Sequence, residues 1–193
     1  MDADRAAAHV IGVLQQAAAA HERRAGQDVS AVVRAAQAMA GAIRAGGKVL
    51  AFGNGGSAAD AQHFVAELVG HYEQDRAALP AVTLSVDTSI LTAVGNDYGY
   101  DRVFARQVEA LGRAGDVALG ISTSGNSPNV LRGLEAARDR GLTTIALTGR
   151  GGEAARLAAI HIGVDEDRTP RVQEVQITLL HSLCELIELE MGD

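Results

Sequence analysis

Two stretches of the chain place side chains capable of proton transfer or metal binding at helical spacing. His63 and Glu67 stand four residues apart, so in a helix they share one face about one turn from each other. Such a pair is either a solvated surface pair or part of a reactive site. Near the C-terminus, seven-residue spacing puts Glu174 nearly in line with His181, while Gln173 lies about 80° around the helix. Spacing alone leaves open which of these two joins His181.

A run of hydroxyl side chains forms a second candidate site. Ser122, Thr123 and Ser124 follow a short apolar run, and Ser127 comes after one glycine and one asparagine. Ser127 is a favourable N-cap, and Pro128 is a favourable first helical residue. Hydroxyl and amide donors at a helix start can bind a phosphate dianion without any lysine. A capped polar turn explains Ser127 and Pro128 but not the three hydroxyls before them, so the pattern predicts a phosphate site.

A glycine-rich loop comes earlier, at residues 53–57, with the sequence Gly-Asn-Gly-Gly-Ser. Ser57 and Asp60 have the spacing of a capping box, which predicts that a helix begins at Ser57. Glycines allow the backbone to approach a ligand closely, although a tight turn without a ligand has the same composition. The loop also meets a loose dinucleotide fingerprint. The acid that this fingerprint requires about 20 residues later is missing, since Asp87 lies further on.

Composition narrows the classes of chemistry and partner. Among 17 basic residues there is one lysine, Lys48, at the start of an apolar run, so Schiff-base chemistry is not expected. Val49 follows Lys48 where a P-loop has Ser or Thr, so P-loop chemistry is not expected either. A net charge of −7 argues against a nucleic-acid-binding surface. The chain has no apolar run of roughly 18 residues and no signal-peptide pattern, and its single cysteine, Cys184, cannot form an internal disulfide. We therefore expect a cytoplasmic protein that binds neither nucleic acid nor membrane.

The candidate residues lie between short apolar runs that alternate with helix-favouring stretches. Continuous apolar runs separated by helices are typical of parallel strands covered on both faces. Strands are expected at 49–52, 81–84, 117–121, 143–147 and 160–164, and helices at 57–71, 88–111, 127–140, 153–158 and 170–191. The pattern predicts a doubly wound α/β fold with a five-stranded parallel sheet. In such sheets ligands bind beyond the carboxyl ends of the strands, where both polar loops fall.

Both ends of the chain are expected to be helical. Residues 1–45 are alanine-rich and break near Ala25–Gly26, which predicts two helices packed on an α/β domain at 46–193, the whole forming one structural unit. The last helix has apolar residues around much of its circumference. We expect it to be buried between subunits of an oligomer, because one helix face does not account for so much apolar surface.

Five segments, in order from Gly46 onward, resemble the phosphoheptose isomerase family of sugar isomerase (SIS) domains. They are GNGGSAADAQHFVAEL, LTAVGNDYGYD, GDVALGISTSGNSPNVL, TTIALTGRGG and RVQEVQITLLHSL. The resemblance implies an aldose–ketose isomerase that converts sedoheptulose 7-phosphate into D-glycero-D-manno-heptose 7-phosphate through an enediol, the first step toward activated heptoses. It also implies a homotetramer with active sites built between subunits, and a zinc ion at each site.

The same resemblance implies roles for individual residues. It places the phosphate at Ser122, Thr123, Ser124 and Ser127. It lines the sugar with Asn54, Gly55, Gly56, Ser57, Glu67, Asn96, Asp97 and Gln173. The zinc ligands that it implies are His63, Glu67, Gln173 and His181, which favours Gln173 over Glu174. Ketose-to-aldose conversion needs a base at carbon and an acid near the oxygens, and Glu67 and His181 are the residues expected in these roles. Whether zinc is catalytic or structural is left open.

Three other functions fit parts of the pattern. A sister family with the same fold binds the bacterial replication initiator, but it lacks the acid and the histidine that correspond to Glu67 and His181. Another SIS isomerase or sensor could act on a different sugar phosphate, although the complete set of four metal-binding residues argues against it. A dinucleotide-dependent oxidoreductase is weakened by the missing acid and by the serine-rich second loop.

Overall fold

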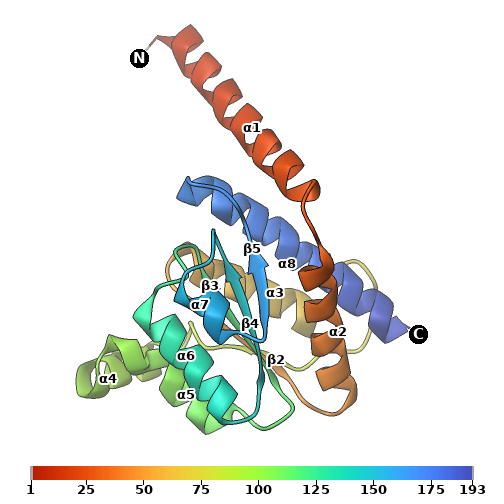
Figure 1. Cartoon of the computed structure of the whole chain (residues 1–193), viewed down its shortest axis with the longest axis vertical. Coiled ribbons are helices and arrows are strands. Elements are labelled where there is room, and N and C mark those ends of the chain that lie inside the picture. The colour runs from red at the N-terminus through yellow and green to blue at the C-terminus, as the bar shows by residue number, and fades with distance from the viewer. Residues whose placement is uncertain (1, 193) are drawn as a thin grey trace.

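A computed structural model describes residues 2–192 and contains a five-stranded sheet in which all neighbouring strands are parallel (Figure 1). The strands are β1 (Val49–Gly53), β2 (Ala81–Thr83), β3 (Val117–Ser122), β4 (Thr143–Thr148) and β5 (Ile160–Gly163), in the spatial order β2-β1-β3-β4-β5. The strand order reverses at β1 and β3, and this is the switch point where such sheets bind ligands. The predicted five-stranded parallel α/β fold is confirmed.

Helices cover both faces of the sheet, because its central strands are apolar on both faces. β1 and β3 are buried along their whole length. One face is covered by α2 (Ser30–Arg44), α3 (Gly56–Val69) and α8 (Thr169–Gly192). The other is covered by α5 (Val103–Leu111), α6 (Pro128–Asp139) and α7 (Glu153–Leu157), around Phe52 and Phe104, whose ring centroids lie 5.2 Å apart.

The helix predicted at 88–111 is in fact three elements. The first, α4 (Thr88–Tyr98), ends at Gly99, and a 3₁₀ turn, η1 (Tyr100–Arg102), precedes α5. Gly99 has a φ of +90°, which L side chains rarely adopt, and a Cβ there would meet Asp101 Oδ1 at 2.8 Å. The glycine therefore interrupts the helix. α4, none of whose residues is buried, stands out from the body of the molecule (Figure 1).

The two N-terminal helices are present with the predicted break between them, but they pack differently. α2 buries Met39, Ile43 and four other residues against the body. α1 (Ala3–Ala25) buries only Ala20 and Arg24 and projects away from the body (Figure 1). The second half of α1 does meet α8, where Arg171 Nη1 donates to the carbonyl oxygen of Val13 at 2.8 Å and His21 pairs with Thr178 at 2.9 Å. The division of the chain at residue 45 stays a prediction.

The apolar surface of α8 is covered mainly by its own chain. Val172, Val175, Leu180, Leu183 and Ile187 are each at most 3% exposed, since α2 and α3 flank the helix. Most of the apolar surface of α8 is thus covered within the single chain, while Leu189 is 60% exposed, and burial of this helix between subunits stays a prediction. No helix within residues 2–192 combines the length and apolar character needed to cross a bilayer.

The one lysine pairs with a buried carboxylate at the amino edge of the sheet. Asp116, which is 2% exposed, accepts hydrogen bonds from Lys48 N at 2.9 Å, Lys48 Nζ at 2.6 Å and Arg113 N at 2.9 Å. Burial raises the pKa of Asp116, but the lysine and the two backbone N–H groups outweigh burial and leave the pKa lowered. Lys48 thus joins β1 to β3 at the edge opposite to the polar loops.

We expect Asp116→Asn to lower the free energy of unfolding by about 1–3 kcal/mol at pH 7, because buried donors lose a charged acceptor. Since the folded pKa is lowered, this stabilisation is present above the unfolded pKa of about 3.9 and is lost as the pH falls through the folded value. Urea unfolding at pH 7 and at about pH 3 measures both conditions. A deficit of equal size at the two pH values would contradict an ionic origin.

Candidate active site

α8 begins directly beside the start of α3, where the Gln173 side chain lies against Gly56. A Cβ on Gly56, the first residue of α3, would lie 2.3 Å from Nε2 of Gln173. One residue earlier on α8, Val172 lies beside Gly149, where a Cβ would be 3.7 Å from Val172 Cγ1 and 2.5 Å from the carbonyl oxygen of Thr123. The glycine loop (residues 53–57), the serine loop (residues 122–127) and the start of α8 therefore meet at the carboxyl edge of the sheet.

Two turns further along the same two helices, three of the predicted residues come together. His63 Nε2 lies 2.9 Å from Glu67 Oε1 on α3, and the His181 ring on α8 stands edge-on to that of His63 with centroids 5.0 Å apart. The side chains of His63 and Glu67 are 46% and 23% exposed, so a ligand can reach them. His181 Nε2 is buried and has no hydrogen-bond partner among residues 2–192. We call this group the histidine–glutamate cluster.

A tyrosine that the sequence analysis missed completes this cluster. Tyr72, in the loop after α3, has its ring centroid 5.3 Å from that of His181. Burial raises the pKa of the Tyr72 phenol, and nearby carboxylates raise it further, so the hydroxyl is protonated at neutral pH. Tyr72 lies in an irregular loop, where spacing does not indicate which way a side chain points.

The first turn of α3 differs from the prediction. The helix begins at Gly56, with Gly55 at its N-cap and no side-chain cap, and Ser57 is buried within the helix. The capping box predicted from Ser57 and Asp60 is therefore wrong, because Ser57 is turned toward the sheet, where a Cβ on Gly53 would meet it at 2.8 Å. Asp60 instead has a buried Oδ2 without a partner among the described residues, and burial raises the pKa of its carboxyl group.

The serine loop brings three hydroxyl groups together. Ser122 Oγ lies 3.1 Å from Ser127 Oγ and 3.5 Å from Ser124 Oγ. Ser127 stands at the N-cap of α6, as predicted, but its hydroxyl faces Ser122 and does not cap the helix. Thr123 lies in the same loop, where its carbonyl oxygen accepts a backbone hydrogen bond. Three converging hydroxyls at a helix start can hold an anion by donating hydrogen bonds to it.

Asn54 links the glycine loop to the start of α6. Its side-chain amide and that of the buried Asn129 exchange two hydrogen bonds of 2.8 Å. A hollow of about 340 Å³ beside this pair is lined by Asn54, Tyr100, Asp101, Ser127, Pro128 and Asn129. Asn129, Tyr100 and Asp101 are further residues that the sequence analysis missed, because nothing in local spacing pairs Asn54 with a residue 75 positions away.

Asn96 and Asp97 lie on α4, which packs against the 3₁₀ turn that carries Tyr100 and Asp101, but neither residue lines the hollow beside Asn54. Both are on α4, where Asn96 Nδ2 donates to Asp97 Oδ1 at 2.8 Å in an exposed position. α4 packs chiefly on η1 and α5. The sugar-binding role implied for these two residues therefore stays a prediction.

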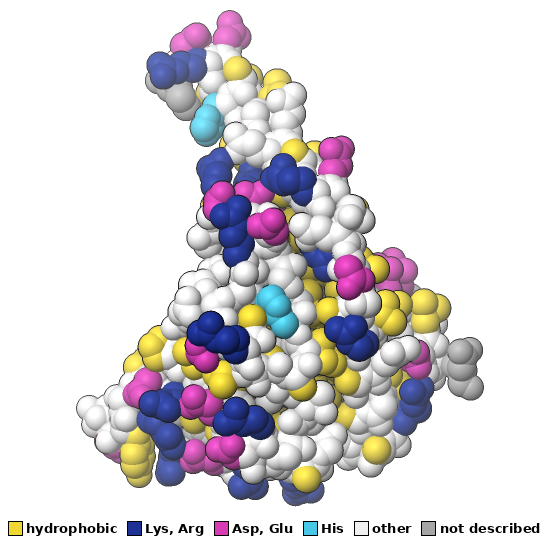
Figure 2. All heavy atoms as spheres, in the orientation of Figure 1, with side chains coloured by type: hydrophobic (Ala, Val, Ile, Leu, Met, Phe, Trp, Pro, Cys, Tyr) yellow, Lys and Arg dark blue, Asp and Glu magenta, His cyan; other side chains and the backbone are white. Residues whose placement is uncertain are grey.

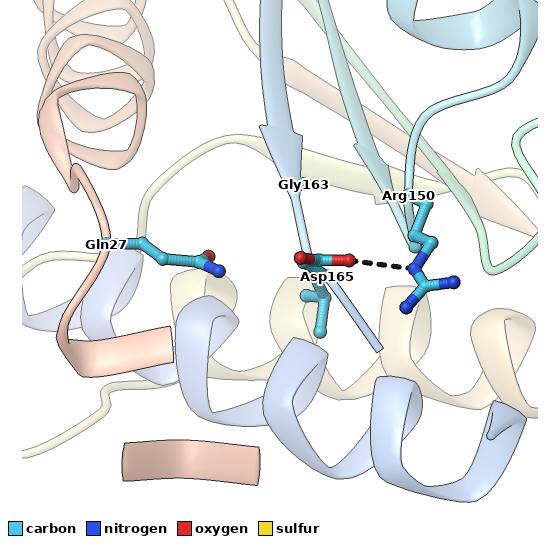
Figure 3. A pocket seen from close by; sticks show the side chains of 6 residues that line it. Gln27, Arg150, Gly163 and Asp165 are labelled. Carbon is cyan, nitrogen blue, oxygen red and sulfur yellow. Dashed lines mark hydrogen bonds and ion pairs between the residues drawn. The ribbon is translucent and has the colours of Figure 1, made fainter. Parts of the chain in front are cut away.

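Another hollow, of about 370 Å³, lies at the carboxyl ends of β4 and β5. It is lined by Gln27, Gly149, Arg150, Gly163, Val164 and Asp165 (Figure 3). Arg150 Nε donates to Asp165 at 2.7 Å, and Arg150 also pairs with Asp167. Because two carboxylates already neutralise this cation, the serine loop is the better candidate for a phosphate.

The residues implied as zinc ligands all lie along the contact between α3 and α8. Imidazole and carboxylate groups are ligands that zinc prefers, and His181 offers a buried Nε2 with no hydrogen-bond partner among residues 2–192. Within residues 2–192, however, no three His, Cys, Asp or Glu side chains are gathered closely enough to hold a metal ion. The donor set fits zinc in kind, while His63 is hydrogen-bonded to Glu67 in this arrangement.

The chain is similar to known proteins over most of its length. Residues 14–149 match the SIS domain family model. The chain is 56% identical over 162 residues to the phosphoheptose isomerase of Geobacter sp. (strain M21), covering 83% of this chain and 84% of that one. It is 59% identical over 158 residues to the phosphoheptose isomerase of Aquifex aeolicus (strain VF5), covering 81% and 83%.

Solved structures give the same result. The phosphoheptose isomerase of Neisseria gonorrhoeae superposes with a TM-score of 0.87 at 47% identity, covering 96% of this chain and 98% of that one. The phosphoheptose isomerase of Francisella tularensis superposes with a TM-score of 0.91 at 38% identity, covering 95% and 98%.

We expect the serine loop to bind inorganic phosphate. The double variant Ser124→Ala, Ser127→Ala should bind phosphate at least about 10-fold more weakly, because each hydrogen bond to a charged group contributes about 1.5–3 kcal/mol. Calorimetric titration with phosphate measures this affinity. Ser89→Ala, on the exposed helix α4, is the matched control. Unchanged phosphate affinity in the double variant would remove the serine loop from this role.

Proposed function

Because the chain belongs to the SIS-domain family and, within it, to the phosphoheptose isomerases, we propose that it converts sedoheptulose 7-phosphate into D-glycero-D-manno-heptose 7-phosphate. The observation that carries this proposal is the histidine–glutamate cluster, in which a carboxylate and two imidazoles lie side by side on α3 and α8. Glu67 and His181 are also the residues that, by the sequence resemblance, set this chain apart from the initiator-binding sister family.

The reaction moves one proton between neighbouring carbons and another between their oxygens, through an enediol. We assign the carbon-bound proton to Glu67. Its Oε1 is hydrogen-bonded to His63, which orients the carboxylate, and Oε2 has no hydrogen bond to the residues that the structure describes. We assign the oxygen-bound proton to His181, since its Nε2 is unpartnered and its ring lies against the same pair.

The serine loop and the histidine–glutamate cluster stand at a distance that suits a long substrate. From the start of α3, beside the polar loops, to His63 is seven residues of helix, about 10 Å. A phosphate held by Ser122, Ser124 and Ser127 would leave an open seven-carbon chain to extend along the α3–α8 contact. Its reacting end would then lie near Glu67. Asn54, the backbone of Gly55 and Gly56, and Gln173 line the start of this path.

We propose zinc as the cofactor, held by His63, Glu67, Gln173 and His181. The mixed imidazole, carboxylate and amide donors and the unpartnered His181 Nε2 support this proposal. When bound, zinc would supply Lewis-acid stabilisation of negative charge on the substrate oxygens. Gln173 would have to keep its place beside Gly56, where any larger residue would displace it.

We propose that the chain acts in the cytoplasm on a phosphorylated heptose and binds neither nucleic acid nor membrane. We also propose that its working form is a homotetramer. The support comes from α1, which exposes 57% of Val10, 55% of Ile11 and 64% of Leu14 on one face. Figure 2 shows apolar side chains on this projecting helix and again on the body below it. A projecting helix with an apolar face is typical of an element that packs against another subunit.

We expect Glu67→Gln to lower turnover by about 10²- to 10⁴-fold, because the amide keeps the size of the side chain but accepts no proton. His181→Gln should have a comparable effect, and the double variant should be scarcely slower than either single one, since the two residues act as a unit. Steady-state assays with sedoheptulose 7-phosphate measure these rates. Glu135→Gln, which removes an exposed ion pair with Arg132, is the control. Wild-type turnover in Glu67→Gln would contradict the assignment.

We expect light scattering to find a particle of four times the 20.0 kDa chain. Replacing Val10, Ile11 and Leu14 together by Ser should shift it to smaller species, because the apolar face of α1 would no longer be buried in the assembly. His9→Ser with Gln15→Ser, which changes exposed polar positions of α1, should leave the mass unchanged. A monomeric wild-type chain would overturn the oligomer proposal.

A further inference from the structure

Glu188 is a buried carboxylate on α8, seven residues after His181 and therefore on the same side of the helix. It is 3% exposed and accepts hydrogen bonds from the backbone N–H groups of Tyr72 at 3.0 Å, Glu73 at 3.2 Å and Gln74 at 3.1 Å. Three successive N–H groups form a concave site for an anion. Burial raises the pKa of Glu188, but these N–H groups and Arg76 outweigh burial and leave the pKa lowered.

Arg76 connects the same carboxylate to the end of α3. Its Nε donates to Glu188 Oε1 at 3.1 Å, its Nη1 to the carbonyl oxygen of Leu68 at 2.9 Å, and its Nη2 to that of Glu67 at 2.8 Å. The last carbonyl groups of a helix have no partners within the helix. The guanidinium therefore provides a donor for Glu67 and a second donor for Leu68, whose carbonyl oxygen also accepts from Leu79 N at 3.0 Å. One of these groups belongs to the candidate base itself.

Together the two side chains determine where the loop after α3 lies. Within residues 2–192, the hydrogen bonds of Glu188 to this loop run to backbone N–H groups and to Arg76, so the carboxylate fixes the path of the loop through its backbone. That path places the Tyr72 ring 5.3 Å from His181. Because His181 Nε2 has no hydrogen-bond partner among residues 2–192, the rings of Tyr72 and His63 are the contacts that orient it there.

We propose that Glu188 and Arg76 are positioning residues of the active site, which act through Tyr72 and the end of α3 to hold His181 and Glu67 in reach of one substrate. This inference rests on the proposed isomerase function. Its physical basis is that a small misplacement of a reacting group costs far more in rate than in binding. The buried ion pair Arg76–Glu188 ties together the two helices that carry the two groups.

The test compares kcat and KM for sedoheptulose 7-phosphate in the full chain and its variants, with thermal unfolding as a check of folding. Tyr72→Ala and Glu188→Gln should each lower kcat about 10- to 100-fold, with KM changed by less than about threefold. Tyr72→Phe, which keeps the ring contact with His181, should lose much less kcat than Tyr72→Ala. The double variant Tyr72→Ala, Glu188→Gln should be no slower than the slower single variant, since both changes act through one contact.

The matched control is Glu190→Gln. Glu190 lies on α8, as Glu188 does, and forms an exposed ion pair with Arg44 of α2, so its replacement should leave kcat unchanged. If Glu188→Gln does not fold, Tyr72→Ala and Arg76→Lys decide by the same loss of kcat. The inference would be overturned by folded variants with wild-type kcat, or by single effects that multiply in the double variant. In both cases an active wild-type chain would still uphold the proposed function. A wild-type chain without isomerase activity would overturn both.

Discussion

The close contact between α8 and the first turn of α3 is the constraint on which the proposed site depends. The Gln173 amide lies against Gly56, and a Cβ at position 56 would lie 2.3 Å from its Nε2, so a side chain there would displace the flexible end of Gln173. From this point the two helices run side by side. His63 and Glu67 on α3 therefore lie opposite His181 on α8. The spacing of polar residues on each helix becomes a single site only because this contact sets how the helices lie against each other.

Two buried ion pairs fix the elements on either side of the proposed site. At the amino edge of the sheet, Asp116 and Lys48 hold β1 to β3, the strands whose carboxyl ends lead into the glycine and serine loops. Beyond the histidine–glutamate cluster, Glu188 and Arg76 hold the loop after α3 against α8. Both carboxylates have a lowered pKa despite burial, because backbone N–H groups and a cation surround them. In the serine loop, by contrast, the hydrogen bonds within residues 2–192 involve hydroxyl, amide and backbone groups, which leaves the serine hydroxyls and the start of α6 to hold a phosphate.

Sequence patterns predict the layers of this fold well, because a strand buried on both faces must be a continuous apolar run. Local patterns fail where a contact comes from far along the chain. Ser57 has the spacing of a helix cap but is turned into the sheet, and Gly99 ends a helix that periodicity alone would continue. The pairing of His63 with Glu67 follows from helical spacing, whereas Tyr72 beside His181 depends on a loop held by Glu188, 116 residues from Tyr72. Side-chain partners at such separations leave no periodic signal.

The central claim is that Glu67 removes the carbon-bound proton of the substrate, and exchange with solvent measures this step most directly. During turnover in deuterium oxide, the wild-type chain should place deuterium on the carbon that receives the proton, as read by NMR of the product and of recovered substrate. Glu67→Gln, saturated with substrate whose phosphate the serine loop still holds, should lose this incorporation by the same factor as its turnover. Incorporation at the wild-type rate in Glu67→Gln would contradict the claim and leave Glu67 at most a metal ligand.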